Sequence, residues 1–283
     1  MSTSIPAGAN PGGSAVRYLD RGEGRIGYDV AGPADAPLVV CLPGMGDLRT
    51  LYRFNVGSLL DAGYRVATMD LRGQGDSDPT FERSDDFATA SDIVALIECL
   101  GGPALVYGNS MSSAAAVVVA SQRSDLVAGL VLTGPFVRDQ PMNPIMARLM
   151  PVLLSRPWGP AAWVNYYSKL YTARRPVDFA EYKAILKNSM KRPAHWKAFQ
   201  ALTRQLKHAA VEQHVASVKA PALVVMGTRD HDFKNPTAEG KFVADRLGAE
   251  LLLVEGAGHY AMVEFPEIVN PRVLEFAKSV FGA

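Results

Sequence analysis

The chain alternates between short, largely apolar runs and longer segments whose apolar residues recur at helical spacing. Residues 38–42, 64–69 and 104–107 are runs of the first kind, each next to Gly or Pro. Such runs are typical of strands buried on both faces of a parallel sheet. Residues 50–62 and 87–100 lie between them and have helical patterns. Because strands alternate with helices, we predict an α/β fold with a mostly parallel central sheet and helices on both faces.

The alternation stops after a predicted strand at residues 127–133. Residues 136–216 contain no convincing strand, and helical patterns recur there at residues 161–171, 180–190 and 196–206. The alternation resumes with an apolar strand at residues 222–226. One α/β domain with a helical insertion fits this order better than two sequential domains.

The predicted core therefore comprises residues 16–135 and 217–283, and residues 136–216 form an inserted helical lid. Two short extended runs near the start of the core predict a hairpin at the edge of the sheet. Residues 1–15 are rich in Gly, Pro, Ser and Ala, which predicts a flexible tail.

The composition is that of an ordinary globular protein, with 48% hydrophobic residues, 20% charged residues and a net charge of +1. This balance points to no nucleic acid and no membrane surface as a partner. The longest apolar run, at residues 114–120, is far shorter than the ~20 residues that span a bilayer. Residues 1–14 lack the features of a secretory signal. We therefore expect a cytoplasmic protein with a small-molecule substrate, and a homo-oligomer is possible.

Ser110 is the candidate nucleophile. The segment Gly108-Asn109-Ser110-Met111-Ser112 follows a predicted buried strand and precedes an Ala- and Val-rich helix. A sharp turn from strand to helix lifts a serine hydroxyl out of the sheet and leaves backbone N–H groups beside it. Taken alone, the segment is equally compatible with a serine in an ordinary turn of small residues.

Candidates for the other catalytic groups follow Ser110 along the chain. A serine nucleophile needs a histidine base, and the histidine needs a carboxylate that orients it. Asp230 follows the strand at residues 222–226, and His259 lies in the loop after the next strand. Catalytic groups gather at the carboxyl ends of strands in open α/β sheets, so the three side chains are expected at one edge. Asp232 and, more remotely, Asp139 are alternative acids, whereas His195, His208 and His214 are expected to be structural.

The tetrahedral oxyanion of acyl transfer needs hydrogen-bond donors. In serine hydrolases with this kind of α/β fold, the donors are the N–H of the residue after the nucleophile and one N–H from the loop after an earlier strand. Here these positions are Met111 and, after Pro43-Gly44, Met45. Only their backbone atoms are required.

Together these residues resemble the α/β-hydrolase superfamily over almost the whole chain after the tail. Residues 70–77, Asp-Leu-Arg-Gly-Gln-Gly-Asp-Ser, are similar to the family's D-x-R-G-x-G-x-S segment, and Gly258-His259 with Glu264 resembles its histidine-loop ending. Two positions depart from the pattern. Pro43 stands where many relatives have His before the oxyanion glycine, and Ser112 replaces the final glycine of the nucleophile turn. Neither change removes a group that the mechanism requires.

The resemblance implies a serine hydrolase of the lid-containing, esterase-like branch that needs no metal or cofactor. Hydrolysis of a small or medium apolar carboxylic ester through an acyl-enzyme is the leading prediction, with the natural substrate left open. Hydrolysis of a carbon–carbon bond is the alternative on the same fold, because the ring-cleavage-product hydrolases resemble this chain at Gly-Asn-Ser-Met. Tyr260, where they have Trp, and the Met45-Gly46-Asp47 segment depart from them. An alternative of another class is a non-catalytic small-molecule receptor.

Overall fold

A computed structural model of the protein describes residues 15–141 and 144–282. Almost all of the predicted tail at residues 1–15 lies outside them. Within the described residues the centre is an eight-stranded sheet in the order β1-β2-β4-β3-β5-β6-β7-β8. Its strands are β1 (Arg17–Asp20), β2 (Arg25–Ala31), β3 (Leu38–Leu42), β4 (Arg65–Met69), β5 (Ala104–Asn109), β6 (Val127–Thr133), β7 (Ala222–Gly227) and β8 (Glu250–Val254). Strands β3 to β8 pair in parallel. Strands β1 and β2 form the expected antiparallel hairpin at one edge, and β2 also pairs antiparallel with β4.

Strands β3 to β7 are buried on both faces, which explains their continuous apolar runs. In β3, Val39 and Cys41 join the hydrophobic cluster on one face, and Leu38, Val40 and Leu42 join the cluster on the other. Successive side chains of a strand point to opposite faces, so a strand between two apolar layers has no polar positions. The predicted mostly parallel α/β sheet is confirmed.

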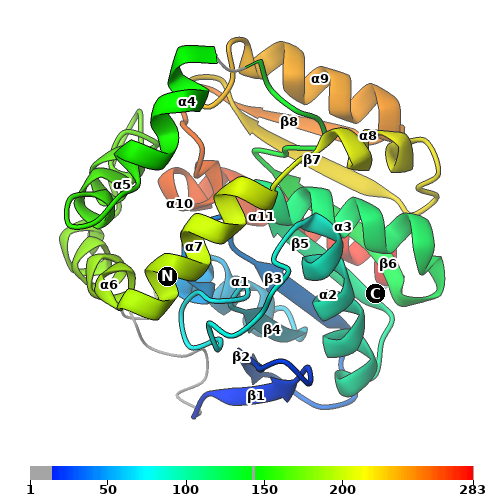
Figure 1. Ribbon diagram of the computed structural model, residues 1–283. Helices are drawn as coiled ribbons and strands as arrows, with labels where there is room; N and C mark the ends of the chain where they lie inside the picture. Colours follow the sequence, from blue (N-terminus) through cyan, green and yellow to red (C-terminus); the bar gives the residue numbers. More distant parts are fainter. Residues whose placement is uncertain (1–14, 142–143, 283) are drawn as a thin grey trace.

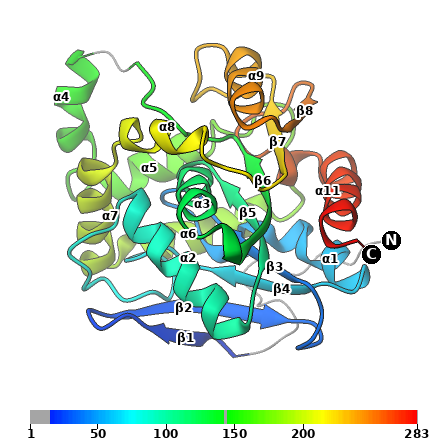
Figure 2. The same cartoon turned by 90° about the vertical axis from the view of Figure 1, so that its right-hand side faces the viewer.

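Helices cover both faces of this sheet (Figures 1 and 2). They are η2 (Arg49–Phe54), α1 (Val56–Asp61), α2 (Asp86–Leu100), α3 (Met111–Gln122), η3 (Ser124–Leu126), α4 (Pro144–Leu153), α5 (Gly159–Tyr167), α6 (Phe179–Lys191), α7 (Pro193–Gln205), α8 (Ala209–Val215), α9 (Pro236–Leu247), α10 (Ala261–Glu264) and α11 (Pro266–Phe281). Figure 2 shows α2 and α3 on one side of the strands and α1 and α11 on the other. None of the helices in the described part of the chain is long and apolar enough to cross a bilayer.

Helices α4 to α8 all lie between β6 and β7, where the sequence lacks strands. Figure 1 shows α4, α5 and α6 grouped beside the sheet, and α7 running back toward it. The sequence pattern predicts α5, α6 and α7 but not α4 or α8. The expected helix at residues 50–62 is instead the 3₁₀ helix η2 followed by the short α1. The buried Arg49 and Arg53 side chains of η2 form ion pairs with Asp29 and Asp178.

Candidate active site

Ser110 lies at the junction of β5 and α3 in a strained conformation. Its φ of 57° and ψ of −124° make it the non-glycine residue with positive φ in the described chain. Such strain persists only where the surroundings impose it, and it is the backbone conformation expected at a nucleophile turn. Small neighbours make the turn possible, since a Cβ on Gly108 would lie 2.6 Å from the Ser112 carbonyl oxygen and one on Gly44 would lie 2.8 Å from Ser110 Cβ.

The structure brings His259 and Asp230 into direct contact. Nδ1 of His259 lies 2.7 Å from Oδ2 of Asp230, and both side chains are buried. Asp230 follows β7, and His259 lies in the loop after β8, where its backbone N–H donates to the Leu170 carbonyl of the insertion. This is the hydrogen bond that fixes the tautomer and orientation of a catalytic histidine.

The loop after β6 links this pair to Ser110. The backbone N–H of Phe136 donates to the Ser110 carbonyl at 3.4 Å, and the Phe136 ring lies 6.0 Å from the His259 ring. A Cβ on Gly134 would lie 3.0 Å from the His259 ring and 3.3 Å from Oδ2 of Asp230. The three residues predicted from the sequence therefore surround one short loop at the carboxyl edge of the sheet. Sequence reasoning missed Gly134 and Phe136, since nothing in their spacing distinguishes them from other loop residues.

The electrostatic potential at His259 is set mainly by nearby carboxylates. Burial disfavours the charged imidazole, but the carboxylates of Asp230, Asp232 and Asp47 together outweigh burial and raise the pKa of His259 to about 9. Asp232 Oδ2 lies 3.6 Å from His259 Nδ1, farther than the hydrogen-bonded Asp230. Asp232 instead accepts a hydrogen bond from Tyr166 of α5. The geometry favours Asp230 over Asp232 as the orienting acid, and Tyr166 is a contact that chain order could not predict.

Asp139, the more remote candidate acid, lies away from His259, whereas the described residues that could bind a metal ion are those around His259. Asp139 is exposed and accepts the backbone N–H of His208 at 2.7 Å, while the His208 ring is paired with Asp86. Among the described residues, ligand atoms of Asp230, Asp232 and His259 lie within 4.8 Å of one another, so this group has donors suited to a metal ion. The 2.7 Å contact between Asp230 and His259 is a direct hydrogen bond, the arrangement that a catalytic triad uses.

The segment after β3 forms a tight turn against Ser110. The Asp47 N–H donates to the Gly44 carbonyl at 3.3 Å, and Gly46 has a φ of 75°, which puts Met45 and Gly46 at the centre of the turn. The Gly46 N–H donates to Oε1 of Gln74 at 2.6 Å, so it is already used. Of the two central N–H groups, that of Met45 is the one left for an oxyanion. The N–H of Met111 begins α3, where amides have no partner within the helix.

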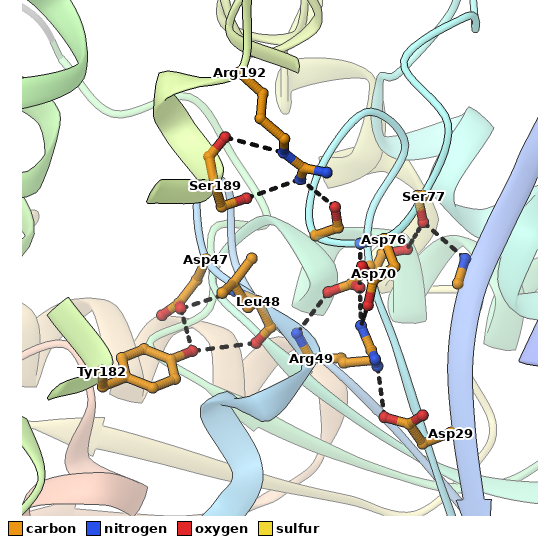
Figure 3. A network of polar contacts seen from close by, with 12 residues as sticks. Asp29, Asp47, Leu48, Arg49, Asp70, Asp76, Ser77, Tyr182, Ser189 and Arg192 are labelled. Atoms are coloured by element: carbon orange, nitrogen blue, oxygen red, sulfur yellow. Dashed lines mark hydrogen bonds and ion pairs between the residues drawn. The ribbon is translucent and has the colours of Figure 1, made fainter. Parts of the chain in front are cut away.

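Polar contacts from the insertion and core hold the chain just beyond this turn (Figure 3). The buried Asp47 carboxylate accepts hydrogen bonds from Tyr182 at 2.6 Å and from the Leu48 N–H at 2.8 Å. Burial raises the pKa of Asp47 to about 6 despite these donors. Arg49 is buried between Asp29 and Asp70. Residues 70–77 thus act on the site by holding η2 and the turn in place.

An apolar cluster lies beside the candidate oxyanion donors. Leu71, Met111 and Leu202 are buried together, and Met45 and Leu206 pack against them. Leu202 lies near the end of α7 and Leu206 directly follows that helix, so the insertion contributes to this cluster. The sequence had indicated an apolar insertion without identifying these residues, because helical spacing does not distinguish a cavity wall from a helix core.

Comparisons with known proteins agree with this architecture. A model described as the alpha/beta hydrolase family matches residues 39–272. The chain is 31% identical to a 2-hydroxy-6-oxononadienedioate/2-hydroxy-6-oxononatrienedioate hydrolase from Burkholderia vietnamiensis, over 92% of this chain and 93% of that protein. It is 24% identical to a proline iminopeptidase from Pestalotiopsis fici, over 91% of this chain and 98% of that protein.

A solved structure gives the same picture at lower identity. The enol-lactonase from Burkholderia xenovorans superimposes with a TM-score of 0.79 at 21% identity, covering 93% of this chain and all of that protein. At this identity the likeness shows a common fold. With the family match over most of its length, the chain belongs to the alpha/beta hydrolase family and is a hydrolase.

Proposed function

We propose that the protein is a serine hydrolase in which Ser110 is the nucleophile. Ser110 Oγ attacks a carbonyl carbon while His259 Nε2 accepts its proton, and Asp230 holds the opposite ring nitrogen and stabilises the imidazolium. His259 then returns the proton to the leaving alcohol, and the acyl group remains on Ser110. A water molecule, deprotonated by His259, attacks the acyl carbon, which releases the acid and restores the Ser110 hydroxyl. The mechanism uses no metal or cofactor.

The observation that carries this proposal is the 2.7 Å hydrogen bond between two buried side chains, His259 and Asp230, close to a serine held at positive φ. The N–H groups of Met45 and Met111 are the proposed oxyanion donors. They would stabilise charge that develops only in the transition state, which is the most effective way to use such donors.

We propose a neutral carboxylic ester, including a lactone, as the substrate class. The charges that act most strongly on His259 are those of Asp230, Asp232 and Asp47. A substrate carboxylate close to His259 would meet the repulsion of these groups in a site of low dielectric constant. The apolar cluster around Met111 and Leu202 suits an uncharged acyl chain.

Hydrolysis of a carbon–carbon bond is the second candidate, and the names of several relatives favour it. The protein from Burkholderia vietnamiensis and a 31% identical protein from Pseudomonas putida are both named as 2-hydroxy-6-oxononadienedioate hydrolases. Those names describe dicarboxylates. A site surrounded by aspartates is less suited to such substrates than to neutral esters.

The first experiment tests the nucleophile by labelling with a fluorophosphonate. We expect the wild-type protein to be labelled, Ser110→Ala to be inert and His259→Ala to react far more slowly. Full labelling of Ser110→Ala would refute the assignment. An unlabelled wild-type protein that binds small esters without turnover would favour a receptor.

The second experiment compares p-nitrophenyl esters of increasing acyl length, a neutral lactone and 2-hydroxy-6-oxononadienedioate as substrates. We expect turnover of the esters or the lactone. Rapid cleavage of the dicarboxylate with inert esters would replace ester hydrolysis by carbon–carbon bond hydrolysis, while leaving Ser110 as the nucleophile.

A further inference from the structure

The two departures from the family pattern, Pro43 and Ser112, contact each other. Ser112 lies in the first turn of α3, and its Oγ donates a 2.5 Å hydrogen bond to the Pro43 carbonyl. Ser112 is completely buried, so the hydrogen bond is shielded from water. A glycine at this position could not make it.

This hydrogen bond joins the two segments that would supply the oxyanion donors. Pro43 directly precedes the turn that contains Met45, and Ser112 directly follows Met111. The turn is held at its other end as well, where the Gly46 N–H donates to Gln74 and the Trp163 ring N–H donates to the Gly46 carbonyl at 3.1 Å. Ser112 therefore fixes the near end of the segment and Gln74 fixes the far end.

We propose that Ser112 is a positioning residue that holds the Met45 N–H at the correct distance from the Met111 N–H. The inference rests on the proposed function, because it concerns the oxyanion donors of that mechanism. Donors stabilise an oxyanion only when they lie about 2.7–3.1 Å from it. A small displacement of the Pro43–Gly46 segment therefore reduces the stabilisation of the transition state more than it reduces the binding of the substrate. Pro43 has no N–H and a fixed φ, so its carbonyl is the group through which a side chain can hold it.

Ser113 is a matched control for this proposal. It is the next residue of α3, it is equally buried, and its Oγ donates a 3.0 Å hydrogen bond to the Gly108 carbonyl. That carbonyl belongs to β5 and not to the turn after β3. Ser112→Ala and Ser113→Ala thus each remove one buried hydroxyl and one hydrogen bond to a carbonyl, but only the first frees the Pro43–Gly46 segment.

The experiment compares the wild-type protein, Ser112→Ala and Ser113→Ala. It measures kcat and KM for the best ester, inhibition by an alkyl boronic acid and the midpoint of thermal unfolding. We expect kcat of Ser112→Ala to fall about tenfold or more with KM nearly unchanged, since misplaced catalytic groups can cost ~100-fold. Boronic acid affinity should fall by a similar factor, because its tetrahedral adduct occupies the oxyanion position. Ser113→Ala should lose similar thermal stability and keep its kcat.

Equal kcat values for Ser112→Ala and Ser113→Ala would overturn the proposal, as would a loss in Ser112→Ala that lies entirely in KM. If Ser112→Ala is too unstable to purify, Gln74→Met tests the far end of the same segment. This variant should likewise lower kcat and leave KM nearly unchanged. An inactive, unlabelled wild-type protein would refute the proposed function instead, so the two failures are distinguishable.

Discussion

Nδ1 of His259 is hydrogen-bonded to Oδ2 of Asp230 at 2.7 Å. A second carboxylate lies nearby, because Asp232 Oδ2 is 3.6 Å from the same nitrogen. The two carboxylates are two residues apart on one loop, and the Asp232 N–H donates to Oδ1 of Asp230 at 3.0 Å. We infer that Asp230 orients the imidazole and that Asp232 mainly adds negative potential.

Exchanging each carboxylate for an amide separates these roles. Asp230→Asn removes the acceptor that selects the active tautomer, so we expect kcat to fall by a factor on the order of 10⁴. Asp232→Asn leaves that hydrogen bond intact and should cost less than tenfold at a pH where His259 is neutral. Steady-state kinetics of the two variants checks this. If Asp232→Asn were the more damaging change, the assignment of the acid would be reversed.

The pH profile should report the raised pKa of His259. The base must be neutral, and a pKa raised to about 9 by the surrounding carboxylates leaves it neutral only at alkaline pH. We therefore expect kcat/KM to rise with pH and to level off above the pKa. Removing the charge of Asp232 stabilises the imidazolium less, so Asp232→Asn should move this rise to lower pH. A rise at the same pH in both proteins would contradict the electrostatic coupling.

Glu264 should be required for the placement of His259. Its buried carboxylate accepts the backbone N–H groups of Thr172, Ala173 and Arg174 from the insertion and of Gly258 beside the histidine. Glu264→Gln would turn one acceptor into a donor facing these amides. Since hydrogen bonds to charged groups contribute about 1.5–3 kcal/mol, we expect that much loss in the free energy of unfolding, together with reduced kcat.

Glu267→Gln is the control for this prediction. Glu267 is exposed and pairs with Arg174 at the surface, where ion pairs contribute about 0–1 kcal/mol. Urea unfolding and kinetics should show little change in Glu267→Gln. Equal effects of the two substitutions would mean that Glu264 has no special role at the site.

Gly134 should tolerate no side chain, because His259 and Asp230 lie against it. Gly134→Ala would put a methyl group 3.0 Å from the His259 ring. Gly134 also has a φ of 51°, so Gly63→Ala is the matched control, with a φ of 88° and open space around its position. Both variants should lose stability through backbone strain. Only Gly134→Ala should lose most of its kcat, and similar kcat losses in both would refute steric contact as the cause.

The sequence by itself determined the sheet and the order of the candidate residues. The strands from β3 to β7 are buried on both faces, which requires continuous apolar runs, and such runs are visible without knowledge of their neighbours. Ser110, Asp230 and His259 could be selected because each follows an element of that sheet, and parallel strands bring their carboxyl ends to one edge.

Only the tertiary structure decided which groups contact one another. The sequence favours Asp230, which is nearer to its strand, but leaves Asp232 as an alternative acid, and a difference of about one ångström at His259 Nδ1 separates the two in the structure. The contact between Ser112 and Pro43 joins residues 69 positions apart, so each appeared only as a local departure from a motif. Local patterns record burial and spacing along the chain, whereas hydrogen bonds across loops depend on how the sheet, the turn and the insertion pack together.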